Sequence, residues 1–329
     1  MTSLASVDEA RAMDREDPLA GFRDMFVIDN ELSAYLDGNS LGRLPKATLS
    51  RLHETIEQGW GRRLVRAWHD SWMDLPLRVG DRLGAVALGA GGGQTVVADS
   101  TTINLYKVLD AAVRLRPERR ELVIDRPNFP TDRYVVEAVA GSHGLEVRWL
   151  PPEAGGGVTA RGLSANVGRD TAAVTLCHVD YRSGALADMG ALTTIAHEAG
   201  GIVVWDLCHS VGVVPVSLDE HDVDLAVGCT YKYLNAGPGS PAFLYVASRL
   251  QEEIEPVIPG WIGAEDVFAM ADVYRPAKGI RRMLSGSPNV LGLVSVDTGL
   301  EVIEAAGIEA IRSKSIALTE WASELCESS

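Results

Sequence analysis

The sequence predicts an α/β protein whose core is a mainly parallel sheet with helices on both faces. The chain has 329 residues and is 46% hydrophobic, which is enough for one large domain or for a large and a small one. Apolar, β-branched runs recur along it, and helical segments lie between several of them. Continuous apolar runs of this kind are typical of strands that helices cover on both faces. We therefore expect strands at residues 122–124, 147–150, 172–176, 202–205, 225–227 and 242–246.

Three further segments carry recognisable patterns. A helix is expected over residues 189–199, since the apolar residues there share one face. The motif YLDGNSLG, from Tyr35 to Gly42, predicts a short strand and a turn, followed by a helix from about residue 46 to 60. Residues 307–329 form an amphipathic pattern with the apolar stripe Ile311, Leu318, Trp321 and Leu325.

Charge and composition exclude several classes of protein. The formal net charge is −15, whereas nucleic acids and anionic membranes reward clustered Lys and Arg, so neither is an expected partner. The N-terminus is charged without an apolar core, and no apolar run is long enough to span a bilayer. The cysteines lack CxxC spacing, so no metal site is expected, and reduced thiols in a cytoplasmic protein are predicted: Cys177, Cys208, Cys229 and Cys326.

Two motifs near the centre of the chain, VVWDLCHS and GCTYKYLNAGPGSPAFLYV, carry the chemistry. Asp206 directly follows one apolar strand, with His209 just beyond it, and Lys232 follows the next strand. Open α/β sheets bind ligands at the carboxyl ends of their strands. A carboxylate and a lysine there suit pyridoxal 5'-phosphate (PLP), because the amine forms a Schiff base with the cofactor and the carboxylate keeps the pyridine nitrogen protonated. Taken alone, a helix-capping Asp and a surface Lys remain the alternative.

A series of motifs, in the same order and at similar spacing, resembles kynureninase: YLDGNSLGRLP, DRPNFPTD, HVDYRSG, VVWDLCHS, GCTYKYLNAGPGSPAFLYV, PGW and IRSKSIALT. The resemblance runs from about Asp17 to Leu318. It implies the aspartate aminotransferase-like (fold type I) architecture of PLP enzymes, with a seven-stranded sheet in the large domain and a homodimer with shared active sites. The implied division is an N-terminal segment that contributes to the small domain (residues 1–75), a PLP-binding large domain (76–295) and the start of a C-terminal small domain (296–329).

The resemblance also implies an activity and assigns its catalytic residues. The family hydrolyses L-kynurenine, and in some members 3-hydroxy-L-kynurenine, to anthranilate or 3-hydroxyanthranilate and L-alanine, in tryptophan catabolism and NAD biosynthesis. Lys232 would bind the cofactor and transfer the substrate α-proton, while Asp206 would pair with the pyridine nitrogen and His209 would sit beside it. Tyr231 would donate a hydrogen bond to the cofactor phosphate and act as an acid in the later proton transfers.

Thr101 and Thr102 acquire a phosphate-binding role through the resemblance. They stand where a strand end gives way to a helix, and the N-terminus of a helix is a site for anions. Without the family, both threonines would be ordinary N-cap residues. Trp261 and Ser287 match positions that reach the active site from the neighbouring subunit, although a tryptophan in a Pro-Gly-Trp turn is also a plausible packing anchor.

The motif DRPNFPTD supplies the remaining cofactor-binding positions. Phe129 would stack on the pyridine face, and Pro130, Thr131 and Asp132 would complete the loop around the cofactor. Read alone, NFPTD is a turn followed by the start of a helix.

Three departures separate this sequence from the family pattern. Ala264 stands where relatives carry a histidine, three residues after the tryptophan of the PGW motif. Cys177 replaces a Thr, Ser or Asn before His178, which leaves a weaker hydrogen-bond donor near the cofactor. The arginine that binds the substrate α-carboxylate belongs to the family's C-terminal segment, and no residue here matches it. Because the helical pattern also runs to Ser329 without a stop signal, we expect a truncated sequence.

Two other functions stay open from the residues alone. One is a different fold type I PLP lyase, such as a desulfurase-like enzyme, although Cys326 lies in a terminal amphipathic helix rather than in a catalytic loop. The other is an inactive truncated homologue that serves only in binding or dimerisation. Intact Asp206, Tyr231 and Lys232 argue against loss of activity by point mutation.

Overall fold

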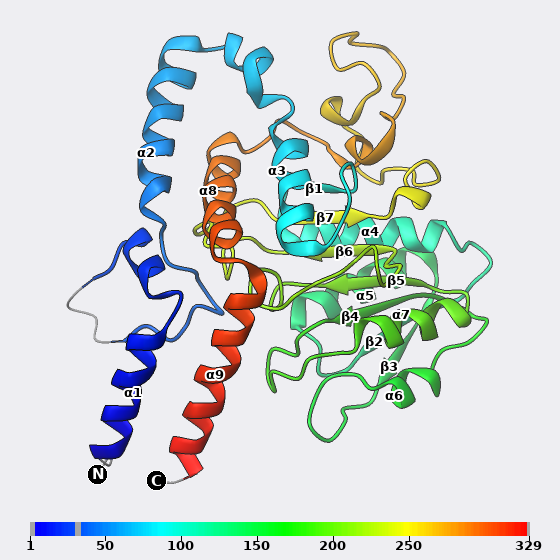
Figure 1. The fold of residues 1–329 in the computed structure, drawn as a ribbon. Coiled ribbons are helices and arrows are strands. Elements are labelled where there is room, and N and C mark those ends of the chain that lie inside the picture. The colour runs from blue at the N-terminus through cyan, green and yellow to red at the C-terminus, as the bar shows by residue number, and fades with distance from the viewer. Residues whose placement is uncertain (1–3, 30–33, 328–329) are drawn as a thin grey trace.

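A seven-stranded sheet forms the centre of the computed structural model, which describes residues 4–29 and 34–327 (Figure 1). Residues 328–329, the end of the predicted C-terminal segment, lie outside this range. The strand order is β1-β7-β6-β5-β4-β2-β3. The strands are β1 Thr95–Val97, β2 Glu121–Asp125, β3 Glu146–Leu150, β4 Thr171–Cys177, β5 Ile202–Asp206, β6 Leu225–Gly228 and β7 Phe243–Val246.

The sheet is mainly parallel, as predicted. Strands β2 to β6 pair in parallel, and β7 alone pairs antiparallel with both of its neighbours, β6 and β1. All six predicted strands are confirmed. Strand β1 was not predicted, because its three residues are too few to show a periodic pattern.

Helices cover both faces of the sheet. Val203 and Trp205 of β5 belong to one hydrophobic cluster and Val204 to another, so this strand is buried on both sides. Helices α4 and α5 pack on one face, and α3, α6, α7 and α8 contribute to the cluster on the other. The helices are α1 Leu4–Glu16, α2 Lys46–Glu54, α3 Leu75–Leu83, α4 Thr101–Arg114, α5 Pro130–His143, α6 Ala160–Ser164, α7 Met189–Glu198, α8 Val290–Ala306 and α9 Ile308–Glu327.

The segment before α2 differs from the prediction. A turn does follow Asp37, whose carbonyl oxygen accepts from the amide of Ser40 at 3.0 Å, but residues 34–37 form no strand. The backbone of this segment instead reaches the loop after β6, where the amide of Gly42 donates to the carbonyl oxygen of Tyr231 at 2.9 Å. A side chain on Gly42 would place its Cβ 2.2 Å from the carbonyl oxygen of Lys232, so only glycine fits this contact.

Helix α2 is shorter than predicted. Its α-helical part ends at Glu54, and the chain continues in wider, π-helical geometry to Arg63. Gly59 and Gly61 lie in this continuation, and glycine weakens regular α-helix. Figure 1 shows α2 extending away from the sheet beside α8, and the hydroxyl groups of Thr48 and Thr298 join the two helices at 2.7 Å.

The predicted C-terminal helix is confirmed as α9. Lys314 of α9 pairs with Asp17, directly after α1, at 2.5 Å, and Figure 1 shows the two chain ends on the same side of the molecule. Along the predicted apolar stripe, Ile311, Trp321 and Leu325 are partly buried, whereas Leu318 is exposed. Within the described ranges, none of the helices has both the length and the apolar character needed to cross a membrane.

Candidate active site

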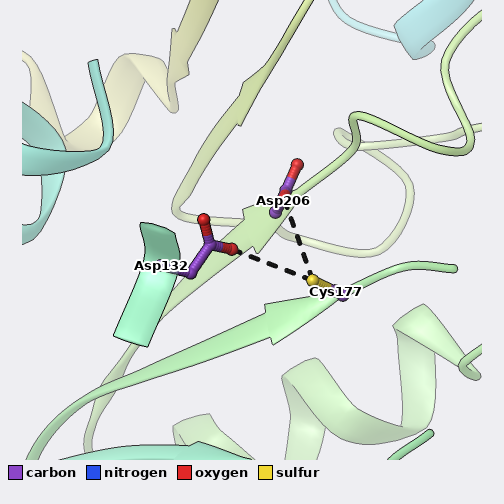
Figure 2. Close-up of side chains that lie close together, drawn as sticks. All are labelled: Asp132, Cys177 and Asp206. Atoms are coloured by element: carbon purple, nitrogen blue, oxygen red, sulfur yellow. Dashed lines mark hydrogen bonds between the residues drawn. The ribbon is translucent and has the colours of Figure 1, made fainter. Parts of the chain in front are cut away.

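Three side chains meet at the carboxyl ends of β4 and β5. Cys177 and Asp206 are the last residues of these strands and lie opposite each other in the parallel register. Asp132, in the first turn of α5, points at the same spot (Figure 2). The Cys177 sulfur lies 3.8 Å from a carboxylate oxygen of each aspartate.

Burial and like charge control the protonation of this cluster. The pKa of Asp132 is raised well above its usual range, first by burial and then by the neighbouring Asp206 carboxylate. Burial, with both aspartates nearby, likewise raises the pKa of Cys177, so its thiol keeps its proton. That thiol donates to Oδ1 of Asn128 at 3.1 Å. Cys177 therefore retains a donor role despite its departure from the family pattern.

Asp206 is fixed by its own backbone neighbourhood. Its Oδ1 accepts from the amide of Cys208 at 2.7 Å, and its carbonyl oxygen accepts from the amide of His178 at 3.0 Å. One carboxylate oxygen is thereby held by the turn after β5, while Oδ2 faces Cys177. The carboxylate is thus oriented before any ligand binds.

Lys232 stands on the loop after β6, opposite the end of β5. Thr230 anchors this loop, because its hydroxyl group donates to the carbonyl oxygen of Pro241 at 2.7 Å. The Lys232 amine lies 2.8 Å from Nε2 of His209. Its distances to the ring centres of Phe129 and Tyr231 are 6.0 and 5.9 Å. The structure thus brings Lys232, His209, Phe129 and Tyr231 together, as the sequence predicted.

The protonation states of His209 and Tyr231 follow from these neighbours. Burial, and then the positive charge of Lys232, lowers the pKa of His209, which makes a neutral imidazole that accepts from the amine. Burial and the Cys229 thiol raise the pKa of Tyr231 to about 12. At neutral pH the Tyr231 hydroxyl is therefore a proton donor.

A cavity of about 430 Å³ opens beside Tyr231 at the N-terminus of α4. Thr101 and Ser287, both predicted cofactor contacts, line it together with Ser100, Ser240 and Ser285. The N-cap of α4 is Ser100, not a threonine, since its hydroxyl oxygen accepts from the amide of Ile103. The Thr101 hydroxyl is thus not used as the helix cap, while Thr102 is exposed on the first turn.

The residues present fit PLP. The cavity combines a helix N-terminus with hydroxyl groups, which is the donor set that binds phosphate. Its one acidic lining residue, Asp99, is neutralised by Lys107 at 2.6 Å. A protonated ring nitrogen would supply the N–H donor and positive charge that complement the buried Asp206 carboxylate. Phe129, at the N-cap of α5, has an exposed face beside Lys232.

Several predicted positions lie further out. Pro130 and Thr131 open α5 between Phe129 and Asp132, where they shape the loop. Trp261 lies with Ala264 on a separate cavity, formed by residues 261–275. Its expected contact with a neighbouring subunit's active site remains a prediction.

No arginine of the described residues lines the cavity at α4. The two arginines nearest in sequence to Ser287 are already engaged. Arg281 donates to the carbonyl oxygen of Ile262, and Arg282 is buried in a pair with Glu252 at 2.5 Å. Neither guanidinium is free to bind a substrate carboxylate in this structure.

Sequence reasoning missed several residues that shape the site. Asn128 links the Asp125 carboxylate to Cys177, and it stands inside the quoted motif DRPNFPTD. Cys208 and Cys229 lie beside Asp206 and Tyr231. The proximity of Cys208 to Cys229 depends on the pairing of β5 with β6, which no local sequence pattern reveals.

The fold and this site define a PLP-dependent enzyme of fold type I. In agreement, the sequence matches the Aminotransferase class-V family over residues 84–329. It is 42% identical over 332 residues to the kynureninase of Pseudomonas fluorescens, covering 98% of this chain and 77% of the relative. It is also 42% identical to the kynureninase of Deinococcus radiodurans, over 99% of this chain and 79% of that relative. The chain belongs to the kynureninase family.

A solved structure supports the fold independently. The cysteine desulfurase from Thermococcus onnurineus NA1 superposes with a TM-score of 0.77, over 95% of this chain and 75% of its own. The two sequences are 20% identical, so this similarity concerns the architecture of the sheet and its helices.

Proposed function

We propose that this chain is a kynureninase, which uses PLP and water to split L-kynurenine into anthranilate and L-alanine. The single observation that carries the proposal is the placement of Asp206 at the end of β5 and of Lys232 on the loop after the neighbouring β6, in a chain 42% identical to the Pseudomonas fluorescens enzyme. Bound PLP would withdraw electrons from the substrate through its protonated ring.

Lys232 is the proposed attachment point and proton carrier. Its amine is held 2.8 Å from neutral His209, which accepts a hydrogen bond from it. Freed from the cofactor by the substrate amine, the Lys232 amine would take the proton from the substrate α-carbon and return it later. Asp206, oriented by the Cys208 amide, would keep the ring nitrogen protonated during this transfer.

Tyr231 is the proposed acid. With a pKa of about 12, its hydroxyl holds a proton at neutral pH and can donate to the cofactor phosphate or to the alanine carbon after the bond breaks. Phe129 would cover one ring face, and Asp132, Thr101, Thr102, Pro130, Thr131, His209, Trp261 and Ser287 would complete the cofactor site.

The direct test is product formation. The protein loaded with PLP and given L-kynurenine should release anthranilate, read by its fluorescence, and an equal amount of alanine. The same protein given L-cysteine tests the desulfurase alternative through sulfide release. Sulfide without anthranilate would reject the proposal in favour of that enzyme class. PLP binding without either product would support an inactive homologue.

The proposed enzyme is a cytoplasmic homodimer whose subunits share active sites. Exposed apolar side chains near Trp261 and along residues 49–65 support a second copy as the partner. Residues 76–295 would form the PLP-binding domain, with 1–75 and 296–329 contributing to a smaller domain. Sedimentation measurements on the purified protein would decide the oligomeric state.

A further inference from the structure

Two cysteines face each other across the pair of strands that carries the proposed site. Cys208 follows Asp206 of β5 by two residues, and Cys229 directly follows β6. Asp206 lies opposite Val227 at the end of the paired region, and Cys208 and Cys229 each come two residues further along, in the turn after β5 and directly after β6. Neighbouring strands lie about 4.8 Å apart, and disulfides need a Cα separation of roughly 4.4–6.8 Å. The two cysteines lie on adjacent chain segments, just beyond the ends of two paired strands.

The side chains turn towards each other as well. The Cys229 thiol points at the carbonyl oxygen of Cys208 from 3.8 Å, and each thiol shifts the pKa of the other. The Cys208 sulfur also lies 4.0 Å from the hydroxyl oxygen of Thr101. A bond between the sulfurs would thus form at the edge of the proposed phosphate site.

The pair can be reached from the cavity. Cys229 lines the cavity at α4 together with Thr101 and Tyr231, although only 2% of its surface is exposed, against 8% for Cys208. Small molecules that enter the cavity meet Cys229 first. A ligand that fills the cavity covers it.

The two thiols differ in acidity. The hydrogen bond from Cys208, and then the positive charge of Lys232, lower the pKa of Cys229 against the effect of burial. The pKa of Cys208 is raised, first by this hydrogen bond and then by burial. Cys229 is accordingly the nucleophile of the pair, and Cys208 the thiol that resolves its oxidised form.

We propose that Cys208 and Cys229 form a reversible dithiol–disulfide pair in the wall of the cofactor cavity, and that bound cofactor protects them from oxidation by peroxides. In the first step the Cys229 sulfur attacks hydrogen peroxide, which yields a sulfenic acid and one water. The Cys208 thiol then displaces the sulfenic hydroxyl group as a second water, forming the S–S bond. Two thiols lose two electrons and two protons in total, and the peroxide accepts them.

The disulfide alters the cofactor site through two contacts. Cys229 no longer offers Tyr231 a thiol partner, and the Cys208 sulfur is drawn away from Thr101. The second half of the proposal, protection by bound PLP, rests on the proposed function, and so does its counterpart, weaker binding of PLP after oxidation. The first half, formation of the bond, does not depend on it.

The experiment treats PLP-loaded and PLP-stripped protein with hydrogen peroxide and follows intact mass and disulfide-linked peptides. Stripped protein should lose two hydrogen atoms and give a Cys208–Cys229 peptide, which dithiothreitol reverses. PLP at about 100 times its dissociation constant should slow the reaction by up to ~100-fold, because only the free cavity reacts. Titration of the oxidised protein with PLP, read by absorbance, should show weaker binding than that of the reduced protein.

Two variants serve as controls. C208A leaves Cys229 without a resolving thiol, so peroxide should yield a sulfenic acid that dimedone traps instead of a disulfide. C326A removes an exposed cysteine of α9 and should leave the Cys208–Cys229 link unchanged. Absence of that link in stripped wild-type protein, or its replacement by another pairing, would overturn the proposal. Equal rates with and without PLP would reject the protection, while loss of anthranilate release alone would bear only on the proposed function.

Discussion

Two regions of the molecule differ in whether their side chains have partners within the chain. In the strand-edge region, residues 206–232, the polar groups of the proposed site have partners within the chain: Asp206 accepts from Cys208, and Lys232 contacts His209. In the arm, residues 46–65, large apolar side chains face outwards, with Trp60 61% and Val65 72% exposed. Figure 1 shows the arm reaching away from the sheet. The polar groups named here are thus held by contacts within one chain, whereas the arm presents an apolar surface suited to a partner.

The largest expected effect is that of Lys232→Ala. Wild-type protein should be yellow as purified, and borohydride reduction should fix PLP on Lys232, as peptide mapping would show. The variant has no amine for attachment or for α-proton transfer, so anthranilate release should vanish even where PLP still binds. Lys278→Ala removes an exposed lysine and should behave as wild type. An adduct on Lys107 or Lys278 would contradict the assignment.

Asp206→Asn should have the second largest effect. An amide cannot hold the ring nitrogen protonated by charge, so kcat should fall on the order of 100-fold or more while substrate binding changes less. Circular dichroism should show an intact fold, because the side-chain oxygen of the asparagine can still accept the hydrogen bond from the Cys208 amide. Asp272→Asn, at an exposed position, is the matched control. A near-normal kcat for Asp206→Asn would reduce this carboxylate to a structural cap.

Trp60→Lys tests the arm. If a second copy covers this surface, the lysine should weaken the dimer by about 2 kcal/mol or more, which is typical of a tryptophan at the centre of an interface. Analytical ultracentrifugation over a dilution series measures the shift, with Arg62→Lys as a charge-conserving control nearby. Unchanged dimerisation in Trp60→Lys would place the interface elsewhere on the molecule.

The smallest effect concerns acid stability. Burial lowers the pKa of His178 to about 4, from an ordinary value near 6.5, so the folded protein resists a proton that the unfolded chain binds. Stability should therefore fall as the pH drops below about 6.5, by about 2 kcal/mol between pH 7 and pH 5. In urea unfolding, the free energy of unfolding of His178→Gln should fall less between pH 7 and pH 5 than that of the wild type. His53→Gln, at an exposed site, should leave it as it is.

The fold could be predicted to the extent that it depends on local pattern. Five of the six predicted strands are runs of apolar residues buried on both faces, as Val203 to Trp205 illustrate, whereas the edge strand β3 is only partly buried. Strand β1 is too short to carry such a signal, and the segment around Tyr35 was wrongly given a strand because its partner lies far away in sequence. Long-range pairing decides these cases.

The candidate site, like the fold, could be predicted where it depends on local sequence and not where it depends on long-range pairing. Residues that follow strand ends, such as Asp206 and Lys232, could be predicted to converge, because parallel strands end at one edge. The thiol pair Cys208 and Cys229 could not, since its contact needs the register between β5 and β6. The cap of α4 was placed one residue late, because Ser100 and Thr101 have similar capping propensities and only the backbone geometry separates them.

The contacts of Gly42 constrain the order in which the site can assemble during synthesis. Its amide bonds to the carbonyl oxygen of Tyr231, and it has no room for a side chain against the Lys232 backbone. The ribosome adds Gly42 long before Tyr231. At roughly 5–20 residues per second, the interval between the two is on the order of ten seconds or more. The lysine loop and the N-terminal segment therefore reach their final positions in one late step, after nearly all of the sheet has been synthesised.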